Sequence, residues 1–387
     1  MTAQPESASV AGGDRAAEPT GAGAPLGPAL SGKVAPEQPV RIFVKGLNWV
    51  GDAILSTPAL THLRRCFPKA HITLMVRPWV AAVHENSPDI DDLWVFDDGE
   101  SWGSFYKATQ MIRKGCFDIG IALPNSTRSA ALLHLGGVRY RIGFNLGGRQ
   151  FLLNRGLRRD PSLLEDHQIF YYLRIIEHLC GKAQGRQQLS LTPGELEVEE
   201  AGQVLAQRGL DRGRPLIGIA PGSINSTAKR WPAERFAELA DQLKEKTEAE
   251  VLLLGSEKEK DVLDRVEASA QTVVHNLGGQ LGLGQAIAMI ARLNGLICND
   301  SGAMHIAAAL GIPTVAIFGP TEWQTTYPFS KSAVIVRKEG IDCAPCMRRD
   351  CPIDHRCMTR ISVQEVFDRF KQTVRQARKD RPASNPS

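Results

Sequence analysis

Several features are missing from this 387-residue sequence. No stretch approaches the ~18 consecutive apolar residues that a membrane-spanning helix needs. Residues 1–39 are rich in Ala, Gly and Pro but lack the apolar segment of a secretory signal peptide. The sequence contains no Walker phosphate loop and no His-Glu-x-x-His motif, and the loop after its first predicted strand lacks the Gly-x-Gly-x-x-Gly pattern of dinucleotide dehydrogenases. These absences argue against an integral membrane protein, a P-loop nucleotidase, a zinc protease and a nicotinamide oxidoreductase.

The composition is that of a globular protein with a mild positive charge. Hydrophobic residues make up 43% of the chain and charged residues 23%. The net charge is +4, of which residues 1–39 contribute −2 and the remainder +6. This balance fits an anionic substrate or an anionic membrane surface, or it serves solubility alone. No basic stripe interleaved with aromatic residues is present, so we expect no nucleic acid partner.

Apolar runs and helical periodicity alternate along most of the chain, which predicts parallel sheets covered on both faces. Strands are predicted at 40–44, 71–76, 93–96, 119–123, 216–220, 251–254, 296–298 and 314–318. The helical segments include one stretch from Ala53 to Cys66, in which we expect a kink at Pro58, and a last amphipathic helix from about Val363 to Arg378.

The pattern loosens near residues 185–214, where we place the connection between two domains. The expected organisation is α/β, with two Rossmann-like lobes and a central cleft. Its parts are a disordered tail at 1–39, a first lobe at 40–190, a second lobe at 215–362, a C-terminal helix at 363–380 and a disordered tail at 381–387.

The segment from Asn299 to His305 runs from a predicted strand into a predicted helix. Free N–H groups at a helix start, backed by the helix dipole, form an anion site, and Gly302 allows a ligand to approach the backbone. A diphosphate is therefore one interpretation. The other is that Asp300 or Ser301 only caps the helix.

A second loop, residues 221–232, also leads from a strand into a helix. Its Ser226 and Thr227 offer hydroxyls, and Lys229 offers a mobile positive charge. In such a sheet this loop and residues 299–304 share one edge, where they could neutralise a diphosphate without a metal. The alternative is a solvated Lys-Arg pair on a surface loop.

Two carboxylates follow other strands. Glu257 is placed to accept hydrogen bonds from ribose hydroxyls, or it is merely a residue at a helix start. Asp52 lies in the loop after the first strand and is placed to project into the cleft, where a single carboxylate opposite a bound donor could act as a general base. Its alternative is again a helix cap.

Half of the eight cysteines are concentrated in one short segment, at Cys343, Cys346, Cys351 and Cys357. A Cys-x-x-Cys pair can bind one tetrahedral metal, so a structural zinc is one interpretation. The second pair is spaced differently, and reduced buried thiols or a disulfide-prone bracing loop are the alternatives. No catalytic cofactor is predicted.

Several of these motifs occur in the order seen in a known family. The chain resembles glycosyltransferase family 9, the ADP-heptose:lipopolysaccharide heptosyltransferases, over residues 40 to about 370. The resemblance is carried by residues 48–52, 123–126, 221–232, 299–305 and 343–357.

The resemblance implies a GT-B fold and an inverting, metal-independent glycosyl transfer, with the acceptor on the first lobe and the ADP-sugar on the second. By position it implies that Asp52 is the base and that Lys229 stabilises the departing ADP. The implied donor contacts are Ser226 or Thr227 for the phosphates, Glu257 for the ribose, Asp300 for the heptose, and the backbone of Ser301, Gly302, Ala303 and Met304, with His305 inside the motif. The implied acceptor contacts are Asn125, Ser126 and Arg128.

The partners implied by the resemblance are ADP-heptose and the lipopolysaccharide core, reached from the cytoplasmic face of the inner membrane by peripheral association. Basic residues near the C-terminus would assist that association, among them Arg375, Arg378, Lys379 and Arg381. The alternatives are a family member with another sugar or acceptor, and a non-catalytic nucleotide-sugar-binding protein.

Overall fold

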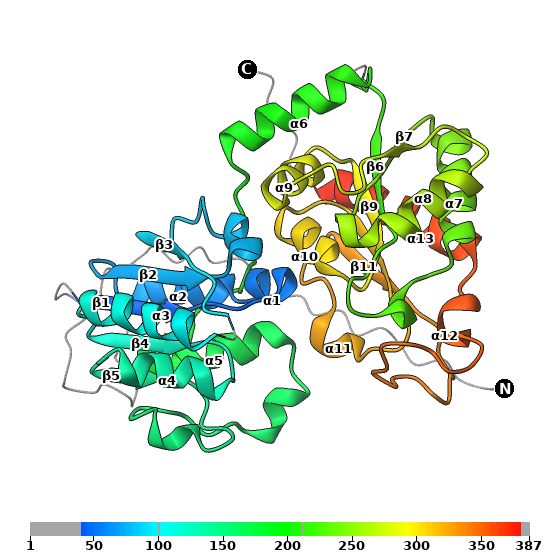
Figure 1. Cartoon of the computed structure of the whole chain (residues 1–387). Helices are drawn as coiled ribbons and strands as arrows, with labels where there is room; N and C mark the ends of the chain where they lie inside the picture. Colours follow the sequence, from blue (N-terminus) through cyan, green and yellow to red (C-terminus); the bar gives the residue numbers. More distant parts are fainter. Residues whose placement is uncertain (1–39, 100, 211–212, 381–387) are drawn as a thin grey trace.

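The computed structural model describes residues 40–99, 101–210 and 213–380, and it consists of two α/β lobes joined by a linker (Figure 1). The disordered tails predicted at 1–39 and 381–387 lie outside the described residues, as does Arg381. Within the described ranges no helix is both long and apolar enough to cross a membrane.

The first lobe is built on a parallel five-stranded sheet with the order β3-β2-β1-β4-β5. Ile42 of the central strand pairs with Ile72 on one side and with Ile119 on the other. Successive residues of a strand face opposite sides of the sheet, so Ile42 and Val44 enter one apolar cluster and Phe43 enters another. The strands are β1 (Arg41–Lys45), β2 (His71–Val76), β3 (Asp92–Val95), β4 (Ile119–Ala122) and β5 (Tyr140–Ile142).

Helices cover both faces of this sheet. Those on the Phe43 side are α3 (Trp102–Lys114) and α4 (Thr127–Leu135), and those on the other side include α2 (Thr57–Cys66) and α5 (Gln168–Cys180). Short 3₁₀ turns occur at η1 (Pro78–Val83), η2 (Arg149–Phe151) and η3 (Pro161–Leu164).

The helical stretch predicted from Ala53 to Cys66 is divided at Ser56, so the kink expected from Pro58 is a break between two helices. The chain forms α1 (Val50–Leu55), breaks at Ser56 and begins again as α2. Pro58 lies in the first turn of α2, where a missing N–H costs nothing, rather than inside a longer helix where it would clash with the preceding turn. The break matters because it makes α1 a separate short helix at the lobe junction.

The linker contains α6 (Glu195–Gln207), and the second lobe has a parallel six-stranded sheet with the order β11-β10-β9-β6-β7-β8. Its strands are β6 (Leu216–Ala220), β7 (Glu250–Leu253), β8 (His275–Asn276), β9 (Gly295–Asn299), β10 (Thr314–Ile317) and β11 (Ala333–Val336). The strands at β5, β8 and β11 were not predicted. β8 has only two residues and β5 three, too few to leave an apolar run, whereas β11 carries the four-residue apolar run Ala333–Val336 and was missed.

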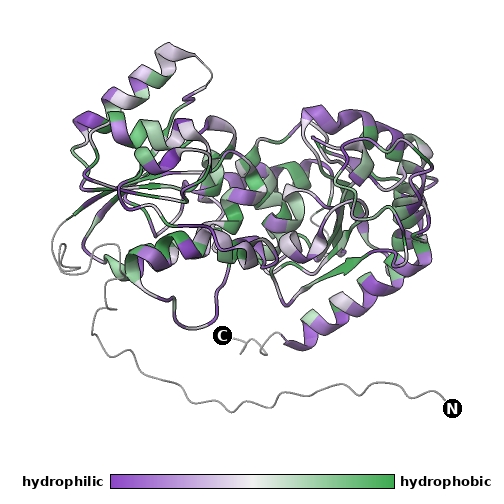
Figure 2. Cartoon of the chain, turned by 90° about the horizontal axis from the view of Figure 1, so that it is seen from below, coloured by the Kyte–Doolittle hydropathy of each residue, from purple (hydrophilic) through white to green (hydrophobic). Residues whose placement is uncertain are grey.

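One face of the second sheet is covered by α7 (Ala233–Thr247), α8 (Lys260–Ser269) and α13 (Val363–Asp380), and the other by α9 (Leu283–Ala291) and α10 (Gly302–Ala309). The remaining elements are η4 (Thr227–Lys229), η5 (Glu257–Glu259), α11 (Trp323–Thr326) and α12 (Arg356–Thr359). The outer side of the helices is hydrophilic, most visibly along the C-terminal helix, whereas the strands inside are apolar (Figure 2).

The lobes meet where α1 lies beside α10 (Figure 1). One continuous apolar cluster includes Ile54 of the first lobe and Met304 of the second. A second contact is polar, because Nε2 of His167 lies 2.8 Å from the carbonyl oxygen of Tyr327. The predicted functional segments therefore lie at an interface that both lobes build.

Candidate functional site

Strand order determines where the candidate residues gather. In the first sheet the chain leaves β1 towards β2 and later returns to β4 on the other side, and in the second sheet β6 has β7 and β9 as its neighbours in the same way. Ligands of parallel sheets bind at the carboxyl ends of strands beside such a switch point. Asp52 and Asn125 follow β1 and β4, whereas Lys229 and Asp300 follow β6 and β9. The topology thus brings all four to the switch points of their sheets.

Asp52 is a largely buried carboxylate in the first turn of α1. Burial raises its pKa to about 6, while a hydrogen bond from Tyr172 and the positive charge of Lys229 act in the opposite direction. The same surroundings raise the pKa of the Tyr172 hydroxyl well above its usual value, first through burial and then through the charge of Asp52. A carboxylate with a pKa near 6 is ionised at neutral pH and still basic enough to accept a proton.

The start of α1 and the start of α10 are in close contact. A β-carbon on Gly51 would lie 2.8 Å from Cδ2 of His305, and one on Gly302 would lie 3.5 Å from Cβ of Val50. The first distance leaves no room for a side chain at Gly51, whereas the second is an ordinary van der Waals contact. The close approach fixes Asp52 beside the first turn of α10. The sequence predicted both glycines as parts of motifs, but not that they face one another.

The first turn of α10 presents free amides. Ser301 is the N-cap residue, yet its side chain makes no capping hydrogen bond. Within the described part of the chain, no protein acceptor receives the N–H groups of Ser301, Gly302 or Ala303. Met304 differs, because its N–H donates to the carbonyl of Ser301 and its side chain is fully buried. The anion site predicted here therefore has three free donors.

His305 lies beneath this turn and is almost completely buried. Burial lowers its pKa to about 4, so the imidazole is neutral at physiological pH. Its Nδ1 is buried without a hydrogen-bond partner in the described ranges. The geometry makes His305 part of the contact with Gly51 rather than a charged ligand for phosphate.

Lys229 and Asp300 form an ion pair at the same edge. Nζ of Lys229 lies 2.8 Å from Oδ2 of Asp300, and the same oxygen accepts a hydrogen bond from Thr321 at 2.7 Å. Both side chains are more buried than exposed, since Asp300 is 8% and Lys229 28% accessible. The neighbouring Asn299 is fully buried and connects β9 to the β6 loop through Pro221 and Trp231.

Ser226 and Thr227 use their hydroxyls within the protein. Ser226 donates to the carbonyl of Arg349 at 2.9 Å, and Thr227 donates to the carboxylate of Asp350 at 2.6 Å. A phosphate oxygen needs a donor, so either hydroxyl would have to exchange its partner to bind one. Their role as phosphate ligands stays a prediction.

The segment that receives these bonds belongs to the cysteine-rich loop, residues 343–357. The loop also accepts the N–H of Ala228 at the Arg349 carbonyl, and Nε2 of His355 lies 2.6 Å from the carbonyl oxygen of Ala228. Both of these contacts are made by Ala228, the residue before Lys229. The loop therefore braces the turn that positions the lysine.

The predicted metal site in this loop is not assembled. Cys343 and Cys346 are exposed, Cys351 is half-buried and Cys357 is buried. The other three thiols help to raise the pKa of Cys357 to about 11, although burial contributes more. Among the described residues, no three of these sulfurs lie within 4.8 Å of one another. The loop as it stands does not fit a tetrahedral zinc.

Glu257 is exposed at the end of β7 and lines a hollow of about 360 Å³ together with Gly278 and Gly279. The nearby Glu259 is buried instead, and it accepts hydrogen bonds from the N–H and hydroxyl of Ser256. Glu257 is thus the carboxylate that a ligand can reach, in keeping with its predicted position, while Glu259 stabilises the turn.

On the first lobe, Asn125 donates to the hydroxyl of Tyr171 at 2.6 Å. Ser126 caps α4, because its hydroxyl oxygen accepts the N–H of Ser129. Arg128 donates to the carbonyls of Asp98 and Ser101 and lies over the ring of Phe105. Asn125 is connected to the Asp52 neighbourhood through Tyr171, which precedes the Asp52 partner Tyr172 on α5.

Two residues in this region were missed. Tyr172 contacts Asp52, and Arg149 is fully buried, with Nε and Nη2 unpartnered in the described structure. Nη1 of Arg149 lies 3.5 Å from Oδ1 of Asn125. In the sequence, Tyr172 is one apolar position of an amphipathic helix, and no local signal distinguishes it from a core residue.

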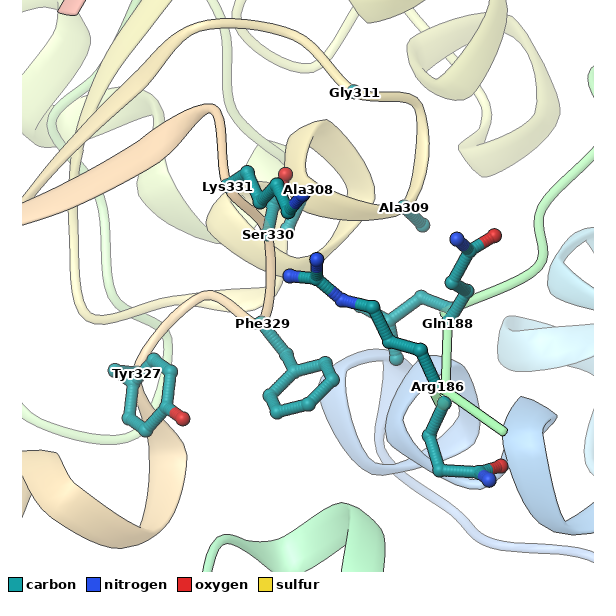
Figure 3. A pocket seen from close by; sticks show the side chains of 11 residues that line it. Arg186, Gln188, Ala308, Ala309, Gly311, Tyr327, Phe329, Ser330 and Lys331 are labelled. Carbon is teal, nitrogen blue, oxygen red and sulfur yellow. The ribbon is translucent and has the colours of Figure 1, made fainter. Parts of the chain in front are cut away.

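A larger pocket of about 390 Å³ lies elsewhere at the lobe junction (Figure 3). The linker side chains Arg186 and Gln188 face the end of α10 and the segment carrying Tyr327 and Phe329. Because α10 rises about 1.5 Å per residue, its last residues lie roughly 10 Å from the free amides at its start. This pocket is therefore separate from the gathered candidate residues.

Comparison with known proteins identifies the family of this chain. Residues 105–356 match the family model for glycosyltransferase family 9 (heptosyltransferase). The chain is 32% identical over 311 residues to lipopolysaccharide heptosyltransferase 2 of Escherichia coli K12, covering 77% of this chain and 88% of that protein.

Two solved structures share the fold over nearly their whole length. The E. coli ADP-heptose LPS heptosyltransferase II has a TM-score of 0.76 at 28% identity, covering 87% of this chain and 99% of that one. A family 9 glycosyltransferase from Veillonella parvula has a TM-score of 0.78 at 25% identity, covering 88% and 100%. The predicted GT-B fold is confirmed, and the chain belongs to glycosyltransferase family 9, the heptosyltransferases.

Proposed function

We propose that this protein transfers a heptose from ADP-heptose to the first heptose of the lipopolysaccharide inner core, with inversion at the anomeric carbon. The observation that carries the proposal is the position of Asp52, a half-buried carboxylate with a pKa of about 6, beside free amides and a lysine on the opposite lobe. The similarity to proteins named heptosyltransferase 2 supports the choice of sugar and acceptor.

In the proposed reaction the Asp52 carboxylate removes the proton from an acceptor hydroxyl. The resulting oxygen attacks the anomeric carbon of the heptose while the bond from that carbon to the β-phosphate oxygen breaks. The electron pair leaves with ADP, and its growing negative charge is stabilised by Lys229 and the N–H groups of Ser301, Gly302 and Ala303. A single base suffices for attack from the face opposite the leaving group, unlike the carboxylate pair of a glycosidase.

The remaining donor contacts follow from position. Asp300 accepts hydrogen bonds from hydroxyls of the heptose once Lys229 turns towards the phosphates. Glu257, in the hollow at β7, accepts hydrogen bonds from the ribose hydroxyls. Ser226 or Thr227 reaches the phosphates after releasing Arg349 or Asp350. On the other lobe, Asn125 contacts the acceptor, and Ser126 and Arg128 shape the loops around it.

Peripheral binding to an anionic membrane surface is a further part of the proposal, with no nucleic acid partner. Arg375, Arg378 and Lys379 lie in the last turns of α13, whose end is exposed and hydrophilic (Figure 2). Basic residues near such a surface each contribute roughly 1 kcal/mol of attraction. Co-sedimentation with vesicles containing anionic lipid, for the wild type and for a variant with these three residues changed to Gln, tests this part.

No metal is required for the proposed transfer. A structural zinc at Cys343, Cys346, Cys351 and Cys357 remains a separate proposal, and it needs the loop to rearrange because the sulfurs are not gathered as they stand. In that case the ion would brace the turn before Lys229 and would take no part in the chemistry.

The function is tested by incubating the purified protein with ADP-heptose and defined core acceptors, one ending in a single heptose and one without heptose. We expect a mass increase of one heptose only on the first acceptor, and the opposite anomeric configuration to that of the donor. Transfer to the second acceptor alone would indicate a family member with another acceptor. Binding of ADP without transfer to either acceptor would indicate a non-catalytic nucleotide-sugar-binding protein.

A further inference from the structure

Three potential metal ligands converge inside the first lobe, away from the lobe junction. His62 and Cys66 are four residues apart on α2, which places both side chains on one face of the helix. Cys180 is the last residue of α5, the helix against which α2 packs. All three are at least nine-tenths buried. No motif marks this group in the sequence.

The spacing of their ligand atoms matches a shared metal better than a disulfide. The imidazole nitrogen and the two sulfurs all lie within 4.8 Å of one another, and Nε2 of His62 is 4.0 Å from Sγ of Cys66. Ligand atoms around one tetrahedral zinc are roughly 3.5 to 3.8 Å apart, given bond lengths of about 2.0 to 2.3 Å. Disulfide sulfurs are about 2.05 Å apart, which would need a larger movement of buried side chains.

A fourth donor is also present. The carbonyl oxygen of Gly181 lies 3.0 Å from Nε2 of His62. Among the described residues this is the one group of three or more His, Cys, Asp or Glu side chains with such spacing, and the cysteine-rich loop does not match it. Two thiolates and an imidazole are ligands that favour zinc over magnesium or calcium.

We propose that His62, Cys66 and Cys180 bind a structural zinc ion, with the Gly181 carbonyl as the fourth ligand. Binding releases two protons, one from each thiol, and the remaining imidazole proton moves to Nδ1 so that Nε2 can ligate. The ion joins the C-terminal ends of α2 and α5. The first of these helices, α2, follows α1, which carries Asp52, and the second, α5, contains Tyr172, so the ion would hold the candidate base and Tyr172 in register.

Cobalt, which replaces zinc and reports thiolate ligation by its near-ultraviolet charge-transfer absorption, provides the test. The full chain is stripped with a chelator under a phosphine reductant and titrated with Co²⁺ and then Zn²⁺. A background variant with Cys343→Ser, Cys346→Ser and Cys351→Ser removes the cysteine-rich loop as a competitor; none of these three side chains is buried. We expect this variant to bind one equivalent of metal and to show the charge-transfer band.

In that background Cys66→Ser or Cys180→Ser should abolish the band, whereas Cys116→Ser, at an exposed cysteine, should leave it unchanged. His62→Gln retains a hydrogen-bond donor for the Gly181 carbonyl. It tests the site independently, should the cysteine variants misfold. It should weaken metal binding at least tenfold and remove the zinc-dependent rise in Tm. The proposal is overturned if the background variant binds no metal, if His62→Gln binds as tightly as its parent, or if Cys66 and Cys180 are recovered as a disulfide under the same conditions.

Discussion

The ammonium nitrogen of Lys229 lies 2.8 Å from a carboxylate oxygen of Asp300, and the two residues come from loops that follow neighbouring strands, β6 and β9. The pair occupies the edge of the sheet where the free amides of α10 begin. In the proposed reaction a bound diphosphate gives the lysine a second anion to neutralise and releases the carboxylate towards the sugar. We therefore propose that the ion pair is the resting arrangement of two groups that serve different parts of one donor.

Replacing Lys229 tests this arrangement. Lys229→Met removes the charge but keeps much of the side-chain volume, and we expect kcat/KM to fall by about 10² to 10³, the usual cost of losing one donor to a developing oxyanion. Lys107→Met, at an exposed lysine on α3, is the matched control and should have no effect. Steady-state kinetics with ADP-heptose measures both. Equal activity of the two variants would remove Lys229 from the mechanism.

The hydrogen bond from Tyr172 lowers the pKa of Asp52, whereas burial raises it to the net value of about 6. Tyr172→Phe removes the lowering contribution, so the pKa of Asp52 should rise and the acid limb of the kcat/KM profile should move to higher pH. Tyr171→Phe is the neighbouring control: its hydroxyl bonds Asn125 rather than Asp52, and it should leave the midpoint in place. A profile whose acid limb does not move in Tyr172→Phe would contradict Asp52 as the group that titrates.

The contact between Gly51 and His305 predicts a steric effect on lobe alignment. In Gly51→Ala the new β-carbon would lie 2.8 Å from a buried imidazole, so the α1 and α10 starts must separate. We expect kcat/KM to fall at least about tenfold, because small displacements of reacting groups are costly. ADP affinity should change little, since its contacts lie on the second lobe. Gly103→Ala, where a β-carbon meets nothing within 4 Å, provides the control; similar kinetics for both variants would argue against the close approach.

A buried carboxylate with a raised pKa also destabilises the fold when it is ionised. The pKa of Asp52 is about 6 in the folded protein against 3.8 ordinarily, so its contribution to stability is present below about pH 4 and is lost as the pH rises through 6. Asp52→Asn should therefore be more stable than the wild type, by a margin that grows with pH and levels off at about 3 kcal/mol. Urea unfolding of both proteins at about pH 5 and pH 8 measures it. A margin that shrinks with pH would show that burial does not set this pKa.

Much of the site followed from the position of residues relative to strands. Asp52, Lys229 and Asp300 each come shortly after an apolar strand, and parallel topology brings such loops to one edge of each sheet. The tertiary partners could not be predicted in this way. Tyr172 reaches Asp52 from a helix more than a hundred residues later, and the hydroxyl of Ser226 is bound by a carbonyl in a distant loop.

The differences between prediction and structure in the fold and in the site have similar causes. The periodicity from Ala53 to Cys66 continues across Ser56 because both helices bury one face, so Pro58 indicates a kink but the periodicity does not show a break. Met304 lies within the matched motif, yet its N–H donates a hydrogen bond to the carbonyl of Ser301 and its side chain is buried. Whether a residue's donor is free depends on its neighbours in space, which spacing along the chain does not specify.

The central claim is that one carboxylate, Asp52, accepts the acceptor's proton during heptose transfer. The most direct measurement is single-turnover transfer from ADP-heptose by the wild type and by Asp52→Asn at saturating acceptor, with ADP-heptose affinity determined on the same samples. We predict a rate at least about 10² lower for the variant, the lower range for a lost general base, with a donor Kd within about twofold of the wild type. A rate within a few-fold of the wild type at unchanged donor affinity would contradict the claim.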